Sequence, residues 1–157
     1  MIIGKQSIQF DRAPYILEAS SVVGKKEGEG PLGKLFDRVE QDPMLGKDTW
    51  EEAESELQKI AAEGVLKKSG LTKADIRYIL AGDLLEQMTA TSFGLMDLEI
   101  PLFGLYGACS TMGEALSLGS MLISGGYGEY IMTVASSHYA GAEKQFRFPL
   151  DYGNQRP

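Results

Sequence analysis

The stretch YGACSTMGEALSLGSMLISGGYGEYIMTVASSH, residues 106–138, decides the fold and contains both the single cysteine and the single histidine of the chain. It opens with a turn of small residues around Cys109. A helical pattern over 114–124 follows and ends at a pair of glycines, and the apolar run YIMTVAS over 130–136 then predicts a buried strand. Cys109 is therefore expected where a strand gives way to a helix.

Two further apolar runs lie upstream and predict two more strands. IRYILA covers residues 76–81 and IPLFGLYG covers 100–107, and LLEQMTATSFGLMDL between them, residues 84–98, favours a helix. A longer helical pattern that follows Asp48 precedes the first of these strands. The alternation of helices and strands is typical of βαβ units. We therefore predict the α/β class, a βαβαβ unit with a mostly parallel sheet and helices on both faces.

The amino-terminal part of the chain gives weaker signals. Residues 6–23 mix apolar and polar positions and predict one or two strands broken by Pro14. Residues 24–36 are rich in glycine and charge and predict a loop. Asp48 and Glu51 have the spacing of a capping box, so the long helix is expected to begin directly after Asp48.

Composition excludes several classes of protein. The chain has 157 residues, 43% of them hydrophobic, which suits one globular domain with a core. Its 15 basic and 22 acidic residues give a net charge of -7, which disfavours nucleic acid as a partner. A single cysteine can form neither an internal disulfide nor a metal cluster, so we expect no metal site and no cofactor.

Targeting and membrane signals are not expected from this sequence. The first residues, MIIGKQSIQFDRAPYILEAS, lack the basic start and apolar run of a signal peptide. A membrane span needs roughly 18 to 20 apolar residues in a row, and the sequence offers no such run. We therefore expect a soluble protein, or one that meets a membrane from the side.

Three chemically active side chains follow the three predicted strands in turn. Asp83 ends the first strand, Cys109 follows the second and His138 follows the third. Ligands of open α/β sheets bind outside the carboxyl ends of the strands. A thiol at a helix amino terminus is also favoured as thiolate by the helix dipole, and the hydroxyl of Ser110 lies in the same turn. We therefore select Asp83, Cys109, Ser110 and His138 as candidate ligand-binding residues.

Each of these residues also has a purely structural alternative. A single cysteine is often a small buried side chain, so Cys109 could fill the core. His138 could make one hydrogen bond in a packed layer. Asp83 could cap the helix that follows it, a role that is compatible with lining a pocket. The sequence leaves these alternatives open.

Four stretches carry a resemblance to a known family. They are EGPLGKLFD, YILAGDLL, YGACSTMGEAL and SSHYAGAEKQFRFPLDYGNQRP. With the elements between them they cover essentially the whole chain. The sequence resembles the thiolase-like superfamily and, closely, its stage V sporulation protein AD family.

The resemblance implies two different functions. In ketoacyl synthases and thiolases, the cysteine that matches Cys109 takes an acyl group from a thioester, and the carboxyl-terminal half of the fold supplies the residues that complete the reaction. The sporulation family implies a non-catalytic role, in which the protein binds dipicolinic acid and helps to move it into the developing spore. Residues matching Asp83, Cys109 and Ser110 lie in or near the family's pocket.

A non-catalytic protein that binds dipicolinic acid is the preferred expectation. An acyltransferase with Cys109 as nucleophile is the alternative. Dipicolinate carries two carboxylates, so cations should contribute to its pocket, and Lys144, Arg147 and Arg156 are the candidates. A calcium chelate of the ligand would neutralise those carboxylates and would let Asp83 act as an oxygen ligand.

The thiolase-like fold has two similar halves, and residues 1–157 match the amino-terminal one. We find no second cysteine turn, so the carboxyl-terminal half is expected to be absent and the chain to be a fragment. The resemblance further implies a homodimer at full length, other spore membrane proteins of the same operon as partners, and a soluble or peripheral place at the inner membrane of the forespore.

Overall fold

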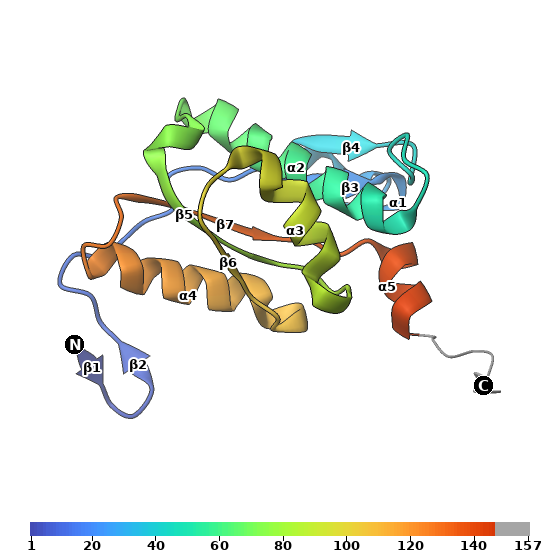
Figure 1. Ribbon diagram of the computed structural model, residues 1–157. Helices are drawn as coiled ribbons and strands as arrows, with labels where there is room; N and C mark the ends of the chain where they lie inside the picture. The colour runs from blue at the N-terminus through green and yellow to red at the C-terminus, as the bar shows by residue number, and fades with distance from the viewer. Residues whose placement is uncertain (147–157) are drawn as a thin grey trace.

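The computed structural model describes residues 1–146 and is centred on a three-stranded sheet (Figure 1). The strands are β6 (Leu102–Gly104), β5 (Ile76–Gly82) and β7 (Tyr130–Ala135), in that order across the sheet. β5 pairs in parallel with both neighbours. This confirms the predicted βαβαβ unit with a parallel sheet.

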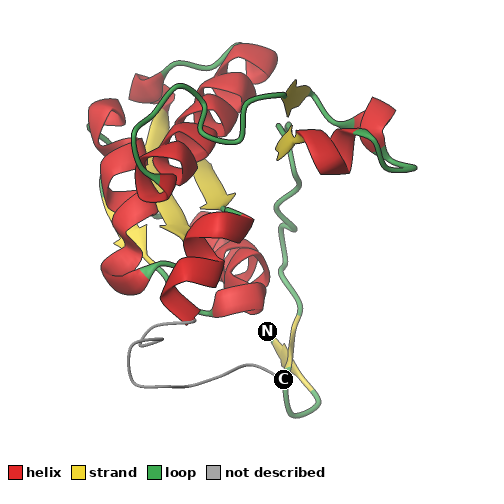
Figure 2. Ribbon diagram, turned by 90° about the vertical axis from the view of Figure 1, so that its right-hand side faces the viewer, coloured by secondary structure: helices red, strands yellow, loops and turns green. Residues whose placement is uncertain are grey.

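Helices cover both faces of this sheet (Figure 2). The buried residues of one face come from β5, β7, α2 (Trp50–Ser69) and α3 (Thr89–Leu95), and are Ala62, Ile76, Ile79, Ala81, Leu95, Met132 and Val134. On the other face, α4 (Thr111–Ser124) contributes to a second cluster of Leu80, Leu105 and Ala115. Successive residues of β5 thus serve opposite faces, as the alternation of side chains along a strand requires. The predicted α/β class is confirmed.

The start of α2 lies one residue later than predicted. The Thr49 hydroxyl accepts a hydrogen bond from the backbone N–H of Glu52 at 3.2 Å, and the Glu52 carboxylate accepts one from the N–H of Thr49 at 3.1 Å. The predicted capping box of Asp48 and Glu51 is therefore wrong. The helix ends at Gly70, which takes a left-handed conformation with φ of 72°.

The amino-terminal residues form two small additions to the main sheet. β1 (Ile2–Ile3) and β2 (Ser7–Ile8) make an antiparallel hairpin. β3 (Val22–Gly24) pairs in parallel with β4 (Arg38–Glu40). Of residues 6–23, which were predicted to form one or two strands, only the two ends belong to strands, in β2 and β3. Residues 9–21 belong to no strand.

The segment predicted as a loop holds two short helical turns. α1 (Lys25–Gly28) follows β3 directly, and a single 3-10 turn covers Gly33–Leu35. The prediction of a continuous loop over 24–36 is therefore wrong in part. Both turns bury no residue, which is why the sequence shows no apolar period there.

Lys68 ties the segment before β3 to the end of α2. Its ammonium group lies 2.6 Å from the carbonyl oxygen of Ala19 and 2.8 Å from the carboxylate of Asp37. The hydrogen bond with Lys68 lowers the pKa of Asp37, and the same bond raises the pKa of Lys68. Because both side chains are partly open to solvent, this pair adds little stability.

The elements nearest the candidate site differ in length from the predictions. The helix predicted over 84–98 is regular only in α3, because Gln87 and Met88 just before it take positive φ angles of 58° and 52°. The strand predicted over 100–107 is regular only in β6. α4 starts immediately after the Cys109 turn, which confirms the predicted change from strand to helix around Cys109. A short helix, α5 (Tyr139–Phe146), ends the described chain.

Within residues 1–146, the structure contains no helix with both the length and the apolar character needed to cross a membrane.

Candidate functional site

The three strands of the main sheet end at one edge. Because β5, β6 and β7 are parallel, their carboxyl ends are neighbours, and these ends are Gly82, Gly104 and Ala135. Asp83, Cys109 and His138 follow these ends in the chain. The structure thus brings the predicted residues to the same edge of the sheet, and their role in binding stays a prediction.

Asp83 is buried at this edge and is only 1% exposed. One carboxylate oxygen accepts a hydrogen bond from the backbone N–H of Leu85 at 2.8 Å. The other accepts from the N–H of Thr91 at 2.7 Å and from the Thr91 hydroxyl at 2.6 Å. Thr91 lies in the first turn of α3, so Asp83 caps that helix from outside it. The alternative that Asp83 caps the following helix therefore agrees with the structure.

Cys109 is exposed, which excludes the alternative that it fills the core. It lies in a single 3-10 turn, Ala108–Ser110, that leads directly into α4. Ala108 takes a left-handed conformation with φ of 49°, which is costly for a residue with a Cβ atom. The turn is therefore held in a strained form that presents the thiol at the head of α4.

Hydrogen bonds within the turn fix its shape. The Ser110 hydroxyl donates to the carbonyl oxygen of Gly107 at 2.6 Å, and the N–H of Gly107 donates to the Thr111 hydroxyl at 3.1 Å. A Cβ atom on residue 107 would lie 2.7 Å from a carboxylate oxygen of Glu114 and 2.8 Å from the Ser110 hydroxyl, so a larger residue there would displace these two side chains. Glu114 therefore places an acidic group beside the Cys109 turn.

His138 is half-buried and contacts a different part of the molecule. Its Nε2 lies 2.8 Å from the carbonyl oxygen of Pro43, and its ring centroid is 5.2 Å from that of Trp50. Among the described residues, the side chains of Asp83, Cys109 and His138 make no hydrogen bond with one another. The structure therefore agrees with the alternative that His138 makes a hydrogen bond within a packed layer.

Behind this edge lies a buried polar network that the sequence analysis missed. The Gln58 amide donates to the Thr91 hydroxyl at 2.9 Å and to the Ser136 hydroxyl at 2.8 Å. Ser136 donates to the carboxyl group of Glu54 at 2.6 Å, and Thr91 donates to Asp83. Two buried carboxyl groups are thereby linked through two hydroxyls and one amide. The network joins α2, α3 and the ends of β5 and β7.

Glu54 is the most unusual member of the network, since its side chain is fully buried. Burial raises the pKa of Glu54, the Ser136 hydrogen bond offsets this in part, and the nearby charge of Asp83 raises it further. One signal in the sequence could have revealed the network. Glu54 and Gln58 are polar residues four apart on the face of α2 that also carries Ala62.

Comparison with known proteins identifies the family. A model of the stage V sporulation protein AD family matches residues 4–157. The chain belongs to this family. Stage V sporulation protein AD of Bacillus subtilis (strain 168) is 40% identical over 156 residues, which cover 99% of this chain and 46% of that protein. The chain thus spans about half the length of the relative that it matches.

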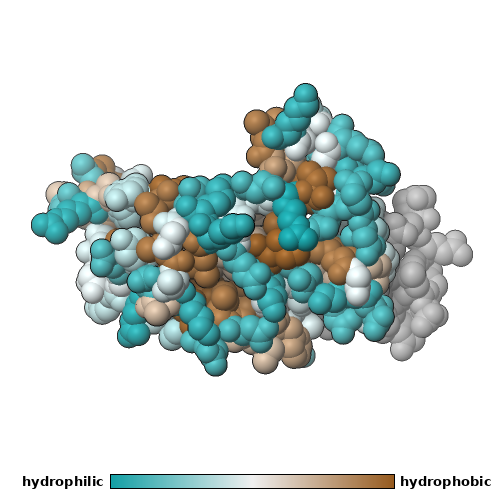
Figure 3. All heavy atoms as spheres, turned by 90° about the horizontal axis from the view of Figure 1, so that it is seen from above, coloured by the Kyte–Doolittle hydropathy of each residue, from teal (hydrophilic) through white to brown (hydrophobic). Residues whose placement is uncertain are grey.

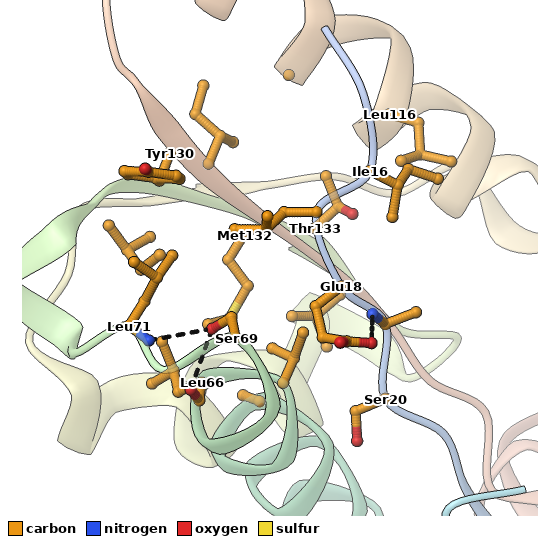
Figure 4. Close-up of a pocket in the computed structure, with 18 of the residues that line it drawn as sticks. Ile16, Glu18, Ser20, Leu66, Ser69, Leu71, Leu116, Tyr130, Met132 and Thr133 are labelled. Carbon is orange, nitrogen blue, oxygen red and sulfur yellow. Dashed lines mark hydrogen bonds between the residues drawn. The ribbon is translucent and has the colours of Figure 1, made fainter.

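In this member of the sporulation protein AD family, an apolar groove lies away from the predicted site. It runs along the free edge of β7, between α2, α4 and the extended residues 14–20 (Figure 4). Residues that line it include Ile16, Glu18, Leu66, Leu116, Tyr130 and Met132. None of Asp83, Cys109, Ser110 and His138 lines this groove. The candidate residues therefore lie outside this groove.

The cations predicted for the site are not all described. Lys144 belongs to α5, which follows His138 directly. Arg147 and Arg156 lie outside the described residues. Their contribution to the site stays a prediction.

Proposed function

We propose that this chain serves sporulation by binding dipicolinic acid and assisting its uptake into the developing spore, through a non-catalytic use of a thiolase-like pocket. The observation that carries the proposal is the family match over residues 4–157, which includes the exposed Cys109 turn. Asp83 is hydrogen-bonded to Leu85 and Thr91 at the start of α3, so we assign the ligand contacts to Cys109 and Ser110.

The chemistry of the turn suits a ligand with carboxylates. The first turn of a helix presents backbone N–H groups and the positive end of the dipole, and α4 is long enough to contribute both. The Ser110 hydroxyl and the Cys109 thiol lie beside these groups on an exposed surface. Flat and small ligands can approach, because the side chains around them are small.

One charge opposes a free dianion at this place. The carboxylate of Glu114, which lies in the first turn of α4, reaches the Cys109 turn at Gly107. The two carboxylates of dipicolinate and the carboxylate of Glu114 would repel one another unless a cation lies between them. A calcium chelate of dipicolinate removes this conflict, because calcium prefers carboxylate oxygens as ligands. We therefore propose the calcium chelate as the bound form.

Calorimetric titration of dipicolinate into the chain, with and without calcium, tests the proposal. We expect binding that is stronger with calcium, and a loss of at least about tenfold in affinity for Cys109→Ala and for Ser110→Ala, the size of one hydrogen bond to a charged group. Ser117→Ala is the matched control, because its hydroxyl also donates to a backbone carbonyl of α4 but lies further along the helix. Absence of saturable binding under both conditions would remove the proposal.

A second function is favoured by the strained Ala108 turn, which resembles the way nucleophiles are presented. In this alternative, the Cys109 thiolate attacks the carbonyl carbon of an acyl thioester, the acyl group passes to Cys109, and the donor leaves as a free thiol. Incubation with a range of acyl-CoA thioesters and intact mass measurement test it. An unchanged mass across the whole range eliminates the acyltransferase.

We also propose a homodimer for the full-length protein and other spore membrane proteins of the same operon as partners at the inner membrane of the forespore. Exposed apolar side chains support association: within residues 1–146, β6 pairs with β5 alone, and its Leu102 and Phe103 are 39% and 48% exposed. Figure 3 likewise shows apolar patches between hydrophilic side chains on one face. Light scattering of wild type and Phe103→Ser checks the dimer, and a monomer in both would contradict it.

A further inference from the structure

Tyr106 lies between the carboxyl end of β6 and the Cys109 turn, and its side chain is 60% exposed. The N–H of Leu105 donates to the carbonyl oxygen of Ala81 at 2.8 Å, so the chain still runs beside β5 just before it reaches Tyr106. A Cβ atom on Gly82 would clash with the carbonyl oxygen of Leu105, which shows how closely the two segments approach. Tyr106 therefore leaves the sheet where the ends of β5 and β6 are in contact.

The side chain of Tyr106 reaches from one strand end to the other. Its backbone belongs to the segment after β6, and its hydroxyl donates to the carbonyl oxygen of Leu84 at 3.4 Å. Leu84 directly follows Asp83 at the end of β5, whereas Cys109 comes three residues after Tyr106. The ring is thus held at both of its ends. It lies between the segment that carries Asp83 and the segment that carries Cys109.

The faces of this ring are open. Within residues 1–146, the ring of Tyr106 stacks on no other aromatic ring and lies under no cation. A single exposed aromatic side chain is ordinary on a protein surface. Tyr106 differs because its hydroxyl bond limits the motion of the ring, and because the Cys109 thiol and the Ser110 hydroxyl belong to the turn that follows. Such a ring offers a surface on which a flat ligand can stack.

We propose that Tyr106 determines the specificity of the candidate site, because its ring stacks on the flat ring of a bound aromatic dicarboxylate while the Cys109 turn contacts the carboxylates. This inference rests on the proposed binding of dipicolinic acid. The pyridine ring of that ligand is electron-poor, which favours offset stacking on the electron-rich phenol ring of a tyrosine. A dicarboxylate without a ring gains nothing from Tyr106.

Diglycolate provides the comparison that tests this inference. It carries two carboxylates around a central oxygen, chelates calcium as dipicolinate does, and has no ring. Each ligand is titrated calorimetrically, in the presence of calcium, into the 157-residue chain and into its Tyr106→Leu variant. We expect Tyr106→Leu to weaken the binding of dipicolinate about tenfold and to leave that of diglycolate within about twofold.

Two further variants serve as controls. Tyr106→Phe keeps the ring and loses only the long hydrogen bond to Leu84, so we expect its affinity for dipicolinate to stay within about threefold of wild type. Tyr127→Leu should leave the affinity unchanged. Tyr127 is a tyrosine of similar exposure, 66%, and it lies just after the opposite end of α4.

The two ligands and the variants give distinct outcomes. Weaker binding in Tyr106→Leu that is confined to dipicolinate, with Tyr106→Phe close to wild type, supports the stacking. Unchanged dipicolinate binding in Tyr106→Leu overturns it, and so does an equal loss for both ligands, which is expected if Tyr106 only shapes the turn. An equal loss in Tyr106→Phe and Tyr106→Leu also overturns it, because the hydroxyl and not the ring would then matter.

The same titrations distinguish this inference from the proposed function. If wild type binds neither ligand, the proposed function fails and the role of Tyr106 fails with it. If wild type binds dipicolinate and Tyr106→Leu binds it equally well, the proposed function stands and only the stacking is wrong. Should Tyr106→Leu fail to fold, Tyr106→Gln, which also lacks a ring, gives the same decision.

Discussion

Asp83 and Cys109 follow neighbouring strands of one sheet, and their surroundings differ in almost every respect. Asp83 is 1% exposed and accepts three hydrogen bonds from two residues. Cys109 is exposed in a turn that is closed by short-range bonds to Gly107. The first is connected to α2 and to the end of β7 through Thr91 and Gln58, whereas the side chain of the second is exposed to solvent.

The difference shows that Asp83 stabilises the fold, whereas Cys109 is free to contact a ligand. A buried, fully bonded carboxylate cannot reach a ligand without the loss of bonds that hold α3, whereas an exposed thiol and hydroxyl can. The polar network therefore fixes the ends of β5 and β7, and the Cys109 turn lies on this fixed edge. A substitution should accordingly affect stability in one region and binding in the other.

The largest effect is expected for Asp83→Ala. It leaves the N–H groups of Leu85 and Thr91 without an acceptor in a buried place, so we expect a loss of roughly 3 kcal/mol or more in the free energy of unfolding. Urea denaturation followed by circular dichroism measures it. A loss below about 1 kcal/mol, the range of an exposed hydrogen bond, would contradict the role of Asp83 as a support.

The next effect concerns pH and Glu54. Its pKa is raised in the folded chain by burial, so the folded state binds the proton more tightly than the unfolded state. The resulting stability is fully present below the ordinary carboxyl pKa of 4.5 and is lost as the pH rises through the raised pKa. Glu54→Gln should remove this decline.

Denaturant midpoints from about pH 4 to pH 8 for wild type and Glu54→Gln check the sign. Exposed acids such as Asp37 titrate equally in both proteins, so their contribution cancels in the difference. Parallel curves for the two proteins would show that Glu54 does not titrate in this range. We expect wild type to lose stability relative to Glu54→Gln as the pH rises. If wild type instead loses stability relative to Glu54→Gln as the pH falls, the sign is reversed.

A smaller effect distinguishes two neighbouring residues at the start of α2. Thr49→Ala removes the hydroxyl that accepts from Glu52, and we expect a loss of about 1 kcal/mol. Asp48→Ala should change stability by less than about 0.5 kcal/mol, because Asp48 does not cap the helix. Thermal unfolding of both variants checks this order. The opposite order would restore the capping box that the sequence predicted.

That one-residue error shows what local sequence patterns leave undecided. DTWEE contains an acid three residues after both Asp48 and Thr49, so the motif alone fits two positions. The strands β5 and β7 were predicted correctly because a compact apolar run with turn residues on each side favours one structure. β6 was overestimated, because the residues at both ends of IPLFGLYG are apolar without belonging to the ladder.

The candidate site was predictable in position and only partly in construction. Parallel strands force Asp83, Cys109 and His138 to one edge, and the order of elements is visible in the sequence. The network behind it was not, because three of the four hydrogen bonds described for it join residues that are 33 to 82 positions apart, as in Gln58 with Thr91 and Glu54 with Ser136. Such pairs depend on how α2 docks on the sheet, which no local pattern determines.

The smallest effect on stability is expected for Cys109→Ser. The side chain is exposed and nearly the same size, so the free energy of unfolding should change by less than about 0.5 kcal/mol. The substitution distinguishes two roles of the thiol. The serine hydroxyl can replace the thiol as a hydrogen-bonding group that contacts the ligand, but a hydroxyl is a far weaker nucleophile than a thiolate. Retained dipicolinate binding together with a lost acyl adduct would assign both properties to one turn. If Cys109→Ser unfolds like Asp83→Ala, the turn is a structural support as well, and the division between the two regions is wrong.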